Sequence, residues 1–257
     1  MLLTGFEGRT VVVTGAAGGI GTAICHTLAA AGARLMAVDR DPEALDRLVR
    51  SIPSATVAGA AVDVTEDGTA EDVLDRAELR LGPVSGLVNA AGVLRAGSAL
   101  TCPDDDWNTL LRVNATGVFA WTRAAARRMV PRRGGAIVTV ASNAIGVPRS
   151  GMAAYSASKA AAAAFTLSLG LEVAQHGVRC NVVCPGTTDT PMLDVLGPDS
   201  TGHALTGNPA AFRVGIPLGR VATPQDIADS IAYLLSDQAR HITMHSLYVD
   251  GGAALHG

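Results

Sequence analysis

The stretch TVVVTGAAGGIG, residues 10–21, decides the fold. Its β-branched residues predict a buried strand, and the glycines after them predict a tight turn into a helix. Glycine leaves the backbone bare, so a pyrophosphate can approach it closely at the positive end of that helix. The spacing G-x-x-x-G-x-G is one residue longer than the common G-x-G-x-x-G. We therefore expect a dinucleotide site that contains Gly15, Gly18, Gly19, Ile20 and Gly21.

Beyond this stretch, short β-branched runs alternate with helix-like stretches rich in Ala and Leu. The alternation predicts βαβ crossovers and a parallel sheet with helices on both faces, which is a doubly wound α/β fold. Strands are expected at 10–14, 34–38, 56–62, 86–89, 136–141, 178–184 and 247–249. Helices are expected at 19–31, 42–51, 67–81, 105–130, 152–176 and 224–235. We expect a single domain over residues 1–257, with the aperiodic stretch 186–219 as a substrate lid.

Composition excludes several classes of protein. The 257 residues are 48% hydrophobic and 17% charged, with a net charge of −3, which is typical of a compact globular chain rather than a disordered one. No basic face stands out, so nucleic acid is not expected as a partner. The chain shows neither a secretory signal nor an apolar run of about 20 residues, so we expect a cytoplasmic protein without membrane contact. The four cysteines lack metal-ligand spacing, and we expect free thiols and no metal.

The second expected strand is followed by an acidic residue, Asp39, twenty-four residues after Gly15. A carboxylate there can accept hydrogen bonds from both hydroxyls of the adenosine ribose, and it repels a 2′-phosphate. The neighbouring Arg40 acts in the opposite direction, because a basic residue can hold that phosphate. We expect NAD rather than NADP.

Tyr155 and Lys159 are four residues apart at the start of an Ala-rich helix, so both project from one helix face. A tyrosine with an ordinary pKa near 10 is a poor base at neutral pH, and a neighbouring ammonium stabilises its phenolate. Ser142 follows the preceding expected strand, at the edge of the sheet where ligands gather in α/β folds. Its hydroxyl could hold a substrate oxygen while Tyr155 takes the proton.

The whole chain resembles the short-chain dehydrogenase/reductase family. The matching pieces are residues 14–21, Asn89-Ala90-Ala91-Gly92, Asn114, Ser142, Tyr155-Ser156-Ala157-Ser158-Lys159 and Pro185-Gly186. The resemblance implies a single doubly wound domain with seven parallel strands. It also implies a homotetramer or homodimer.

The resemblance further implies roles for individual residues. Asn114, Ser142, Tyr155 and Lys159 would form a catalytic tetrad, in which Asn114 orders a water that relays protons from Lys159. The Lys159 ammonium would also bind the nicotinamide ribose. The remaining implied cofactor contacts are Asp63 and Val64 at the adenine, Asn89, Ala90 and Gly92 along the adenosine, and Pro185, Gly186, Thr188 and Thr190 near the nicotinamide.

Within the family, several segments resemble the 2,3-dihydro-2,3-dihydroxybenzoate dehydrogenases of catechol siderophore pathways. Examples are residues 88–98, 147–155 and 177–192. The implied reaction is NAD-linked oxidation of the C3 ring hydroxyl of a small cyclic dihydrodiol carboxylic acid. Such a pocket needs a cation or donors for the carboxylate. The candidate substrate residues are Arg149, Arg95, Ser142, Met152 and Met192, and either arginine could reach the site.

Two alternatives stay open at the level of sequence. The first is the same oxidation of 2,3-dihydro-3-hydroxyanthranilate, an amino-alcohol carboxylic acid, in a natural-product pathway. The second is a general NAD(P)-dependent carbonyl reductase, which Asp39 and the net charge disfavour. Residues 197–208 are short and glycine-rich where the family resemblance implies a lid helix, so substrate contacts from this segment stay undetermined.

Overall fold

The sheet is built from seven parallel strands in the order β3-β2-β1-β4-β5-β6-β7. A computed structural model describes residues 3–53, 56–197 and 199–255. The strands are β1 (Thr10–Thr14), β2 (Arg34–Asp39), β3 (Val57–Ala61), β4 (Val84–Asn89), β5 (Gly135–Val140), β6 (Val178–Pro185) and β7 (Ser246–Val249). Every expected strand is present, with ends that differ from the prediction by at most two residues. The predicted doubly wound α/β class is confirmed.

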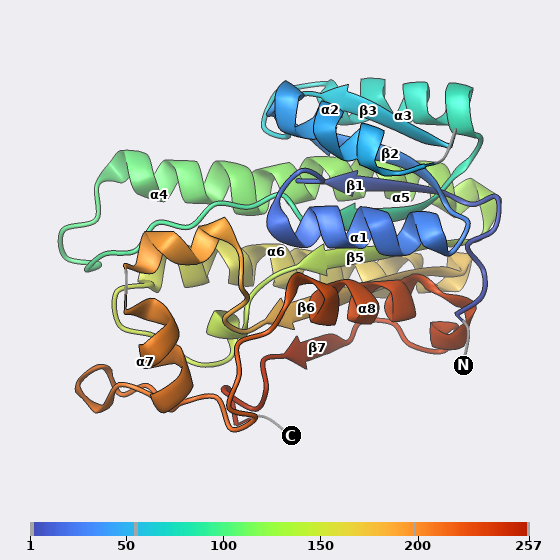
Figure 1. The fold of residues 1–257 in the computed structure, drawn as a ribbon. Coiled ribbons are helices and arrows are strands. Elements are labelled where there is room, and N and C mark those ends of the chain that lie inside the picture. The colour runs from blue at the N-terminus through green and yellow to red at the C-terminus, as the bar shows by residue number, and fades with distance from the viewer. Residues whose placement is uncertain (1–2, 54–55, 198, 256–257) are drawn as a thin grey trace.

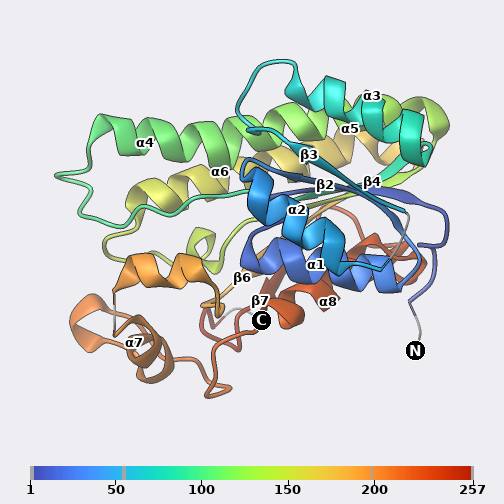
Figure 2. The ribbon, with the colours of Figure 1, turned by 45° about the horizontal axis from the view of Figure 1, so that its top comes forward.

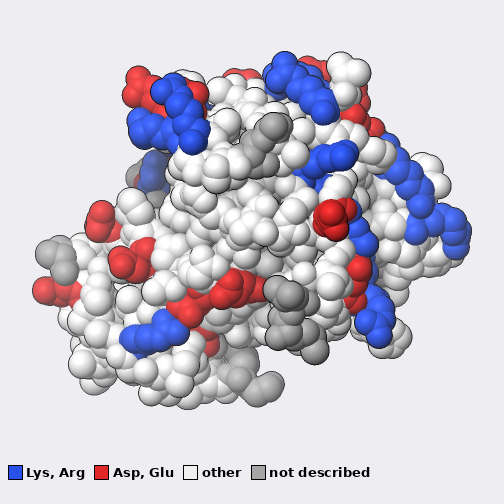
Figure 3. Space-filling view, turned by 45° about the vertical axis from the view of Figure 1, so that its right-hand side comes forward, with Lys and Arg blue, Asp and Glu red and all other residues white. Residues whose placement is uncertain are grey.

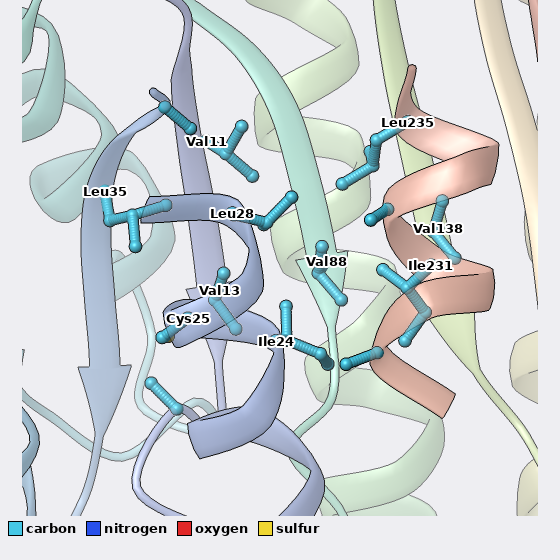
Figure 4. Packing of buried hydrophobic residues seen from close by; sticks show 14 of the residues in the cluster. Val11, Val13, Ile24, Cys25, Leu28, Leu35, Val88, Val138, Ile231 and Leu235 are labelled. Carbon is cyan, nitrogen blue, oxygen red and sulfur yellow. The ribbon is translucent and has the colours of Figure 1, made fainter. Parts of the chain in front are cut away.

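Helices cover both faces of this sheet (Figures 1 and 2). The helices of one face are α1 (Gly19–Ala30), α2 (Pro42–Ser51) and α8 (Pro224–Leu235), and those of the other are α3 (Thr69–Leu81), α5 (Val118–Arg132) and α6 (Ala153–Val173). In Figure 4, Ile24 and Leu28 of α1 and Ile231 of α8 point at Val88 and Val138 of the sheet. Because the strands are buried on both faces, their sequences are apolar rather than alternating.

The helix expected over 105–130 is interrupted, and this prediction of one continuous helix is wrong. The chain forms α4 (Asp104–Leu111), then the π-helical turn η1 (Arg112–Gly117), and then α5. A π turn adds one residue without changing the apolar pattern much, so helical periodicity does not reveal it. The turn buries Asn114 completely, and π turns are frequent at functional sites.

The segment 186–219 contains more regular structure than its aperiodic sequence predicts. It forms the 3-10 turn η4 (Pro191–Leu196), the helix α7 (Ser200–Thr206) and the 3-10 turn η5 (Pro209–Ala211). Residue 198 is not among those described. A short helix therefore occupies part of the glycine-rich stretch 197–208. The orange segments of Figure 1 lie beyond the carboxyl ends of the strands, beside the start of α6.

Charges of both signs lie on the surface, and the cysteines are unpaired. On the face shown in Figure 3, basic and acidic residues are interspersed rather than gathered into one basic field. Among the described residues, no helix is long and apolar enough to span a bilayer. All four cysteines are free thiols, and Cys25, Cys180 and Cys184 are buried, where burial raises the pKa of each to about 12.

Candidate active site

Parallel pairing brings the ends of four strands to one edge of the sheet. The register pairs Thr14 with Asn89, Asn89 with Thr139, and Val140 with Val183. The loops after these strands therefore meet, although they are far apart in the sequence. Two adjacent pockets lie along this edge.

The turn after β1 has no room for side chains. Gly15 has a φ of +65°, and a Cβ on it would lie 2.6 Å from the backbone of Ala91. A Cβ on Gly21 would lie 2.0 Å from the carbonyl oxygen of Gly15. A Cβ on Gly19 would lie 2.7 Å from Cγ2 of Thr190. Glycine is thus required at these three positions. Helix α1 starts within this turn, and the first backbone N–H groups of a helix have no partner inside the helix.

The first pocket, which we call the aspartate pocket, is formed by the ends of β1 to β4. Its lining residues are Gly15, Gly18, Asp39, Arg40, Val62, Asp63, Val64, Ala90, Ala91, Gly92, Val93 and Val113. Asp39 Oδ2 accepts a hydrogen bond from the backbone N–H of Ala17 at 3.0 Å, which ties the carboxylate to the glycine turn. Bare backbone, a helix N-terminus and a fixed carboxylate fit a dinucleotide with its pyrophosphate at the turn and its ribose at Asp39.

Asp63 lies in this pocket beside two arginines. Burial raises the pKa of its carboxyl, but hydrogen bonds from Thr65 and the charges of Arg40 and Arg112 outweigh that effect and leave the pKa below its ordinary value. The N–H of Thr65 donates to Asp63 Oδ1 at 2.8 Å. Asp63 is therefore a fixed acceptor at neutral pH.

The second pocket, which we call the tyrosine pocket, is formed by the ends of β5 and β6 and by the segment after β6. Its lining residues are Ile20, Leu94, Val140, Ala141, Ser142, Asn143, Ala144, Arg149, Met152, Tyr155, Lys159, Pro185, Gly186, Thr187, Thr188, Thr190, Met192, Leu193, Leu196 and Arg213. Three members of the expected tetrad, all four of the expected contacts near the nicotinamide and four of the five candidate substrate residues thus line one hollow.

Tyr155 is buried in the tyrosine pocket. Burial raises the pKa of its phenol, whereas a hydrogen bond with the Ser142 side chain and the charge of Arg149 lower it. The net direction is upward, so the phenol of the protein without ligands is neutral at pH 7. Ser142 Oγ accepts from the N–H of Ala144 at 3.1 Å, which leaves its own hydrogen available to another oxygen.

Lys159 is buried, and no carboxylate pairs with it among the described residues. Its Nζ donates to the carbonyl oxygen of Val140 at 2.9 Å. Burial lowers the pKa of the ammonium to about 8, while Cys184 acts weakly in the opposite direction. A Cβ on Gly92 would lie 2.9 Å from this Nζ and 3.2 Å from Asn114 Oδ1, so a side chain at this position would displace the ammonium.

Asn114 does not line either pocket, but its contacts reach α6. Its Oδ1 accepts from the N–H of Val93 at 2.9 Å, and its Nδ2 donates to the carbonyl of Val93 and to Ser158 Oγ, each at 2.9 Å. Ser158 in turn donates to the carbonyl of Tyr155 at 2.7 Å. The π turn therefore ties the end of β4 to the first turns of α6.

Other expected site residues lie outside both pockets. Asn89 is buried and donates to the hydroxyls of Thr122 and Thr139 at 2.8 and 3.1 Å. Gly19 and Gly21 act through the tight turn described above. Arg95 is half exposed and forms an ion pair with Asp106 at 3.4 Å, in a separate surface pocket.

The structure adds residues that the sequence did not single out. Arg213, Asn143 and Thr187 all line the tyrosine pocket. The sequence could have pointed to Asn143 as a pocket residue, because it directly follows Ser142. Arg213 lies 58 positions beyond Tyr155, and no local pattern links the two. Among the described residues, no cluster of three or more His, Cys, Asp or Glu side chains could hold a metal.

Comparison with known proteins identifies related chains. The family model described as "short chain dehydrogenase" matches residues 9–201. A Bacillus subtilis (strain 168) protein named 2,3-dihydro-2,3-dihydroxybenzoate dehydrogenase is 47% identical, over 98% of both chains. An Escherichia coli (strain K12) protein of the same name is 42% identical, over 97% of this chain and 98% of that protein. A Vibrio cholerae protein named vibriobactin-specific 2,3-dihydro-2,3-dihydroxybenzoate dehydrogenase is 37% identical, over 95% of both chains.

The pKa of Lys159 can be measured directly, because it is the single lysine of the chain. Lysine labelled with ¹³C at Cε gives one resonance, and we expect it to titrate with a midpoint of about 8 in the protein without cofactor. The physical reason is the cost of burying the ammonium. A midpoint at the ordinary value of 10.5 would contradict this description of the site.

The same shift makes stability depend on pH. Between about pH 8 and 10.5 the folded protein has lost the Lys159 proton while the unfolded chain retains it. The free energy of unfolding of the wild type should therefore rise with pH relative to that of Lys159→Met, by at most about 3 kcal/mol. Urea denaturation at several pH values measures the difference, and a difference that does not change with pH would refute the expectation.

Proposed function

This chain belongs to the short-chain dehydrogenase family and is an oxidoreductase that uses a nicotinamide cofactor, and from that premise we propose that it oxidises the C3 hydroxyl of 2,3-dihydro-2,3-dihydroxybenzoate with NAD. The product is 2,3-dihydroxybenzoate, a catechol that would supply siderophore biosynthesis. The observation that carries the proposal is the likeness, over almost the full length, to proteins named for this reaction. The composition of the tyrosine pocket supports it.

In the proposed reaction, Tyr155 is the base. The Tyr155 phenolate takes the proton of the C3 hydroxyl. At the same time the C3–H bond breaks, and its hydrogen leaves with the electron pair of the bond as hydride. The oxidised nicotinamide supplies the hydride acceptor and a positive ring charge. The C2 hydrogen then leaves as a proton and the C3 ketone gains one, which gives the aromatic catechol. The overall balance is one dihydrodiol and one NAD⁺ to one catechol, one NADH and one proton.

The residues around Tyr155 serve this step through their charges and donors. Burial raises the pKa of the phenol, so forming the phenolate requires compensating interactions. Ser142 provides one through its hydrogen bond and Arg149 another through its charge. The Lys159 ammonium in the same pocket adds a second positive charge. Ser142 would also hold the substrate oxygen. With a pKa of about 8, Lys159 can exchange its proton near neutral pH.

Asn114 is proposed to order a water on the path of that proton. Both amide hydrogens of its side chain are already used by Val93 and Ser158. Asn114 can therefore hold a water only through an oxygen atom. A residue in a π turn has a displaced backbone hydrogen-bond pattern, which is compatible with that task.

Substrate binding is proposed to involve Arg149, Met152 and Met192. Arg149 brings a cation into the tyrosine pocket, as a carboxylic acid substrate requires. The two methionines offer adaptable apolar surface for the ring. The position of Arg95, outside this pocket and paired with Asp106, favours Arg149 as the carboxylate ligand.

NAD is proposed over NADP because of Asp39. Its carboxylate is fixed in the aspartate pocket by the N–H groups of Ala17 and Asp41. A 2′-phosphate at the same place would meet a negative charge. Among the described residues that line this pocket, Arg40 is the only basic one, and it favours the phosphate.

Two further properties of the chain are proposed. We treat residues 186–219 as a substrate lid, because Thr188, Thr190 and Met192 line the tyrosine pocket and α7 lines the adjoining hollow. We also propose a homo-oligomer, either a dimer or a tetramer. The partly exposed rings of Phe119 and Phe165, in edge contact with 5.2 Å between centroids, give α5 and α6 an apolar contact surface. Sedimentation of the purified protein would measure its mass.

The function is tested by NAD⁺ reduction, followed at 340 nm, with 2,3-dihydro-2,3-dihydroxybenzoate. The wild type should turn it over and release the catechol, and Tyr155→Phe should lower kcat by on the order of 10² to 10⁴, because the base is lost while the ring stays. The second arm uses 2,3-dihydro-3-hydroxyanthranilate, which the names of the relatives do not favour. Preference for that amine would move the enzyme to the alternative reaction, and turnover of neither would refute the proposal.

The cofactor preference is tested by Asp39→Asn, with Asp41→Asn as the matched control. Asp41 caps α2 through the N–H groups of Glu43 and Ala44 and does not line either pocket. We expect Asp39→Asn to lower the ratio of kcat/KM for NAD⁺ over NADP⁺ by about tenfold or more, because it removes the charge that repels a 2′-phosphate. If both variants change the ratio equally, Asp39 does not discriminate between the cofactors.

A further inference from the structure

Arg213 enters the tyrosine pocket from the segment between η5 and α8. It is half buried, and its Nη2 donates to Thr187 Oγ1 at 2.9 Å. Its backbone pairs with Asn208 in an antiparallel bridge, with N–H to O distances of 3.0 and 2.8 Å in the two directions. Arg213 is thus held through both its backbone and its guanidinium, on a part of the chain that the tetrad does not use.

Arg149 reaches the same pocket from the loop before α6. Its Nη2 donates to Asn143 Oδ1 at 2.9 Å, and Asn143 Nδ2 donates to Asp250 Oδ2 at 3.0 Å. Arg149 Nε is buried without a hydrogen-bond partner among the described residues. A buried, unsatisfied N–H of a cation is costly, and an added acceptor removes that cost.

The two arginines repel each other. In the described residues no carboxylate lies within 4.0 Å of either guanidinium. Burial, and after it the charge of Arg213, lowers the pKa of Arg149 to about 10, although Asp250 and Tyr155 act in the opposite direction. Burial also lowers the pKa of Arg213. Two desolvated cations without an ion pair form a site that one anion would satisfy.

We propose that Arg213 and Arg149 together bind the carboxylate of the substrate, so that Arg213 is a specificity-determining residue. The inference rests on the proposed function for the identity of the substrate, but the anion site follows from the contacts above. Both arginines line the tyrosine pocket and also the adjoining hollow that contains Ser200 and His203. They therefore stand at the wall between the two hollows and would hold the carboxylate at the side of the ring away from the aspartate pocket.

This arrangement selects acids over neutral diols. Guanidinium groups bind carboxylates through charge-assisted hydrogen bonds that are about twice as strong as neutral ones. A neutral substrate would leave both cations partly desolvated and without an ion pair, which is a penalty against it. Since Arg213 is carried by the segment after η5, substrate binding also links that segment to the loop of Arg149.

The test measures ligand binding separately from turnover. The complex with NAD⁺ is titrated calorimetrically with 2,3-dihydroxybenzoate and with catechol, which lacks the carboxylate. For Arg213→Met we expect affinity for the acid to fall on the order of 10- to 100-fold. Affinity for catechol should change less than about threefold, and Arg213→Lys should recover part of the loss for the acid because it retains the charge.

Arg240→Met serves as the matched control, because Arg240 is exposed and lies outside the tyrosine pocket. It should bind the acid as the wild type does. Circular dichroism and urea denaturation establish that each variant is folded. In parallel, kcat/KM is measured with 2,3-dihydro-2,3-dihydroxybenzoate and with its methyl ester.

The outcomes separate the two proposals. If the wild type binds the acid in an Arg213-dependent way but oxidises no dihydrodiol, the proposed function fails and the anion site stands. If the wild type oxidises the dihydrodiol but Arg213→Met weakens acid and neutral ligands equally, the function stands and the inference is overturned. A wild type that binds catechol as tightly as the acid also overturns it.

Discussion

The parallel pairing of β1, β4, β5 and β6 is the constraint on which the rest of the structure depends. These four strands run in the same direction, and each is hydrogen-bonded to its neighbour in the order given. All four therefore end at the same edge of the sheet. Helices bury both faces of the sheet, so this edge is where loops can differ without exposing the core (Figure 1). The glycine turn, the loop after β4, Ser142 and the segment after Pro185 meet for this reason. The topology thus determines where the site lies, and the side chains of these loops determine its chemistry.

The electrostatics of the tyrosine pocket follow from the same geometry. Lys159, Arg149 and Arg213 line the hollow around Tyr155, and Asp250 is the acidic residue that acts on Arg149. The carboxylate of Asp250 already accepts from Asn143 and from the N–H of Gly252. Positive charge is therefore in excess where a phenolate and a substrate carboxylate are proposed to lie. Burial makes these cations costly without such anions, and this cost favours binding of an acidic substrate.

The sequence predicted the regular parts of this structure well, because they depend on local patterns. Strand ends agree to within two residues, and the glycine turn between β1 and α1 lies where its spacing placed it. The π turn at residues 112–117 could not be predicted, since one added residue leaves the apolar pattern of 105–130 intact. Helix α7 was missed because its seven residues include a glycine and are too few to show a period.

The prediction of individual site residues divides in a similar way. Tyr155, Lys159 and Ser142 could be predicted to line one pocket, because they follow a strand or share a helix face. The choice between Arg95 and Arg149 was open, because both lie in loops whose paths depend on tertiary contacts. Arg213 was not considered at all, since only its bridge to Asn208 and its bond to Thr187 bring it to the pocket.

The two pockets are also lined by different parts of the chain. The aspartate pocket is formed by residues from Gly15 to Val113, whereas the tyrosine pocket draws most of its lining from residues after 140. The segment that carries Arg213 packs around a small cluster of Ala204, Ile216 and Ala253, apart from the two large cores. Substitutions there perturb few buried contacts, so the charge of the tyrosine pocket can change while the sheet and the aspartate pocket stay as they are. In the proposed function, recognition of the substrate therefore depends on a segment that contributes only a small buried cluster of its own.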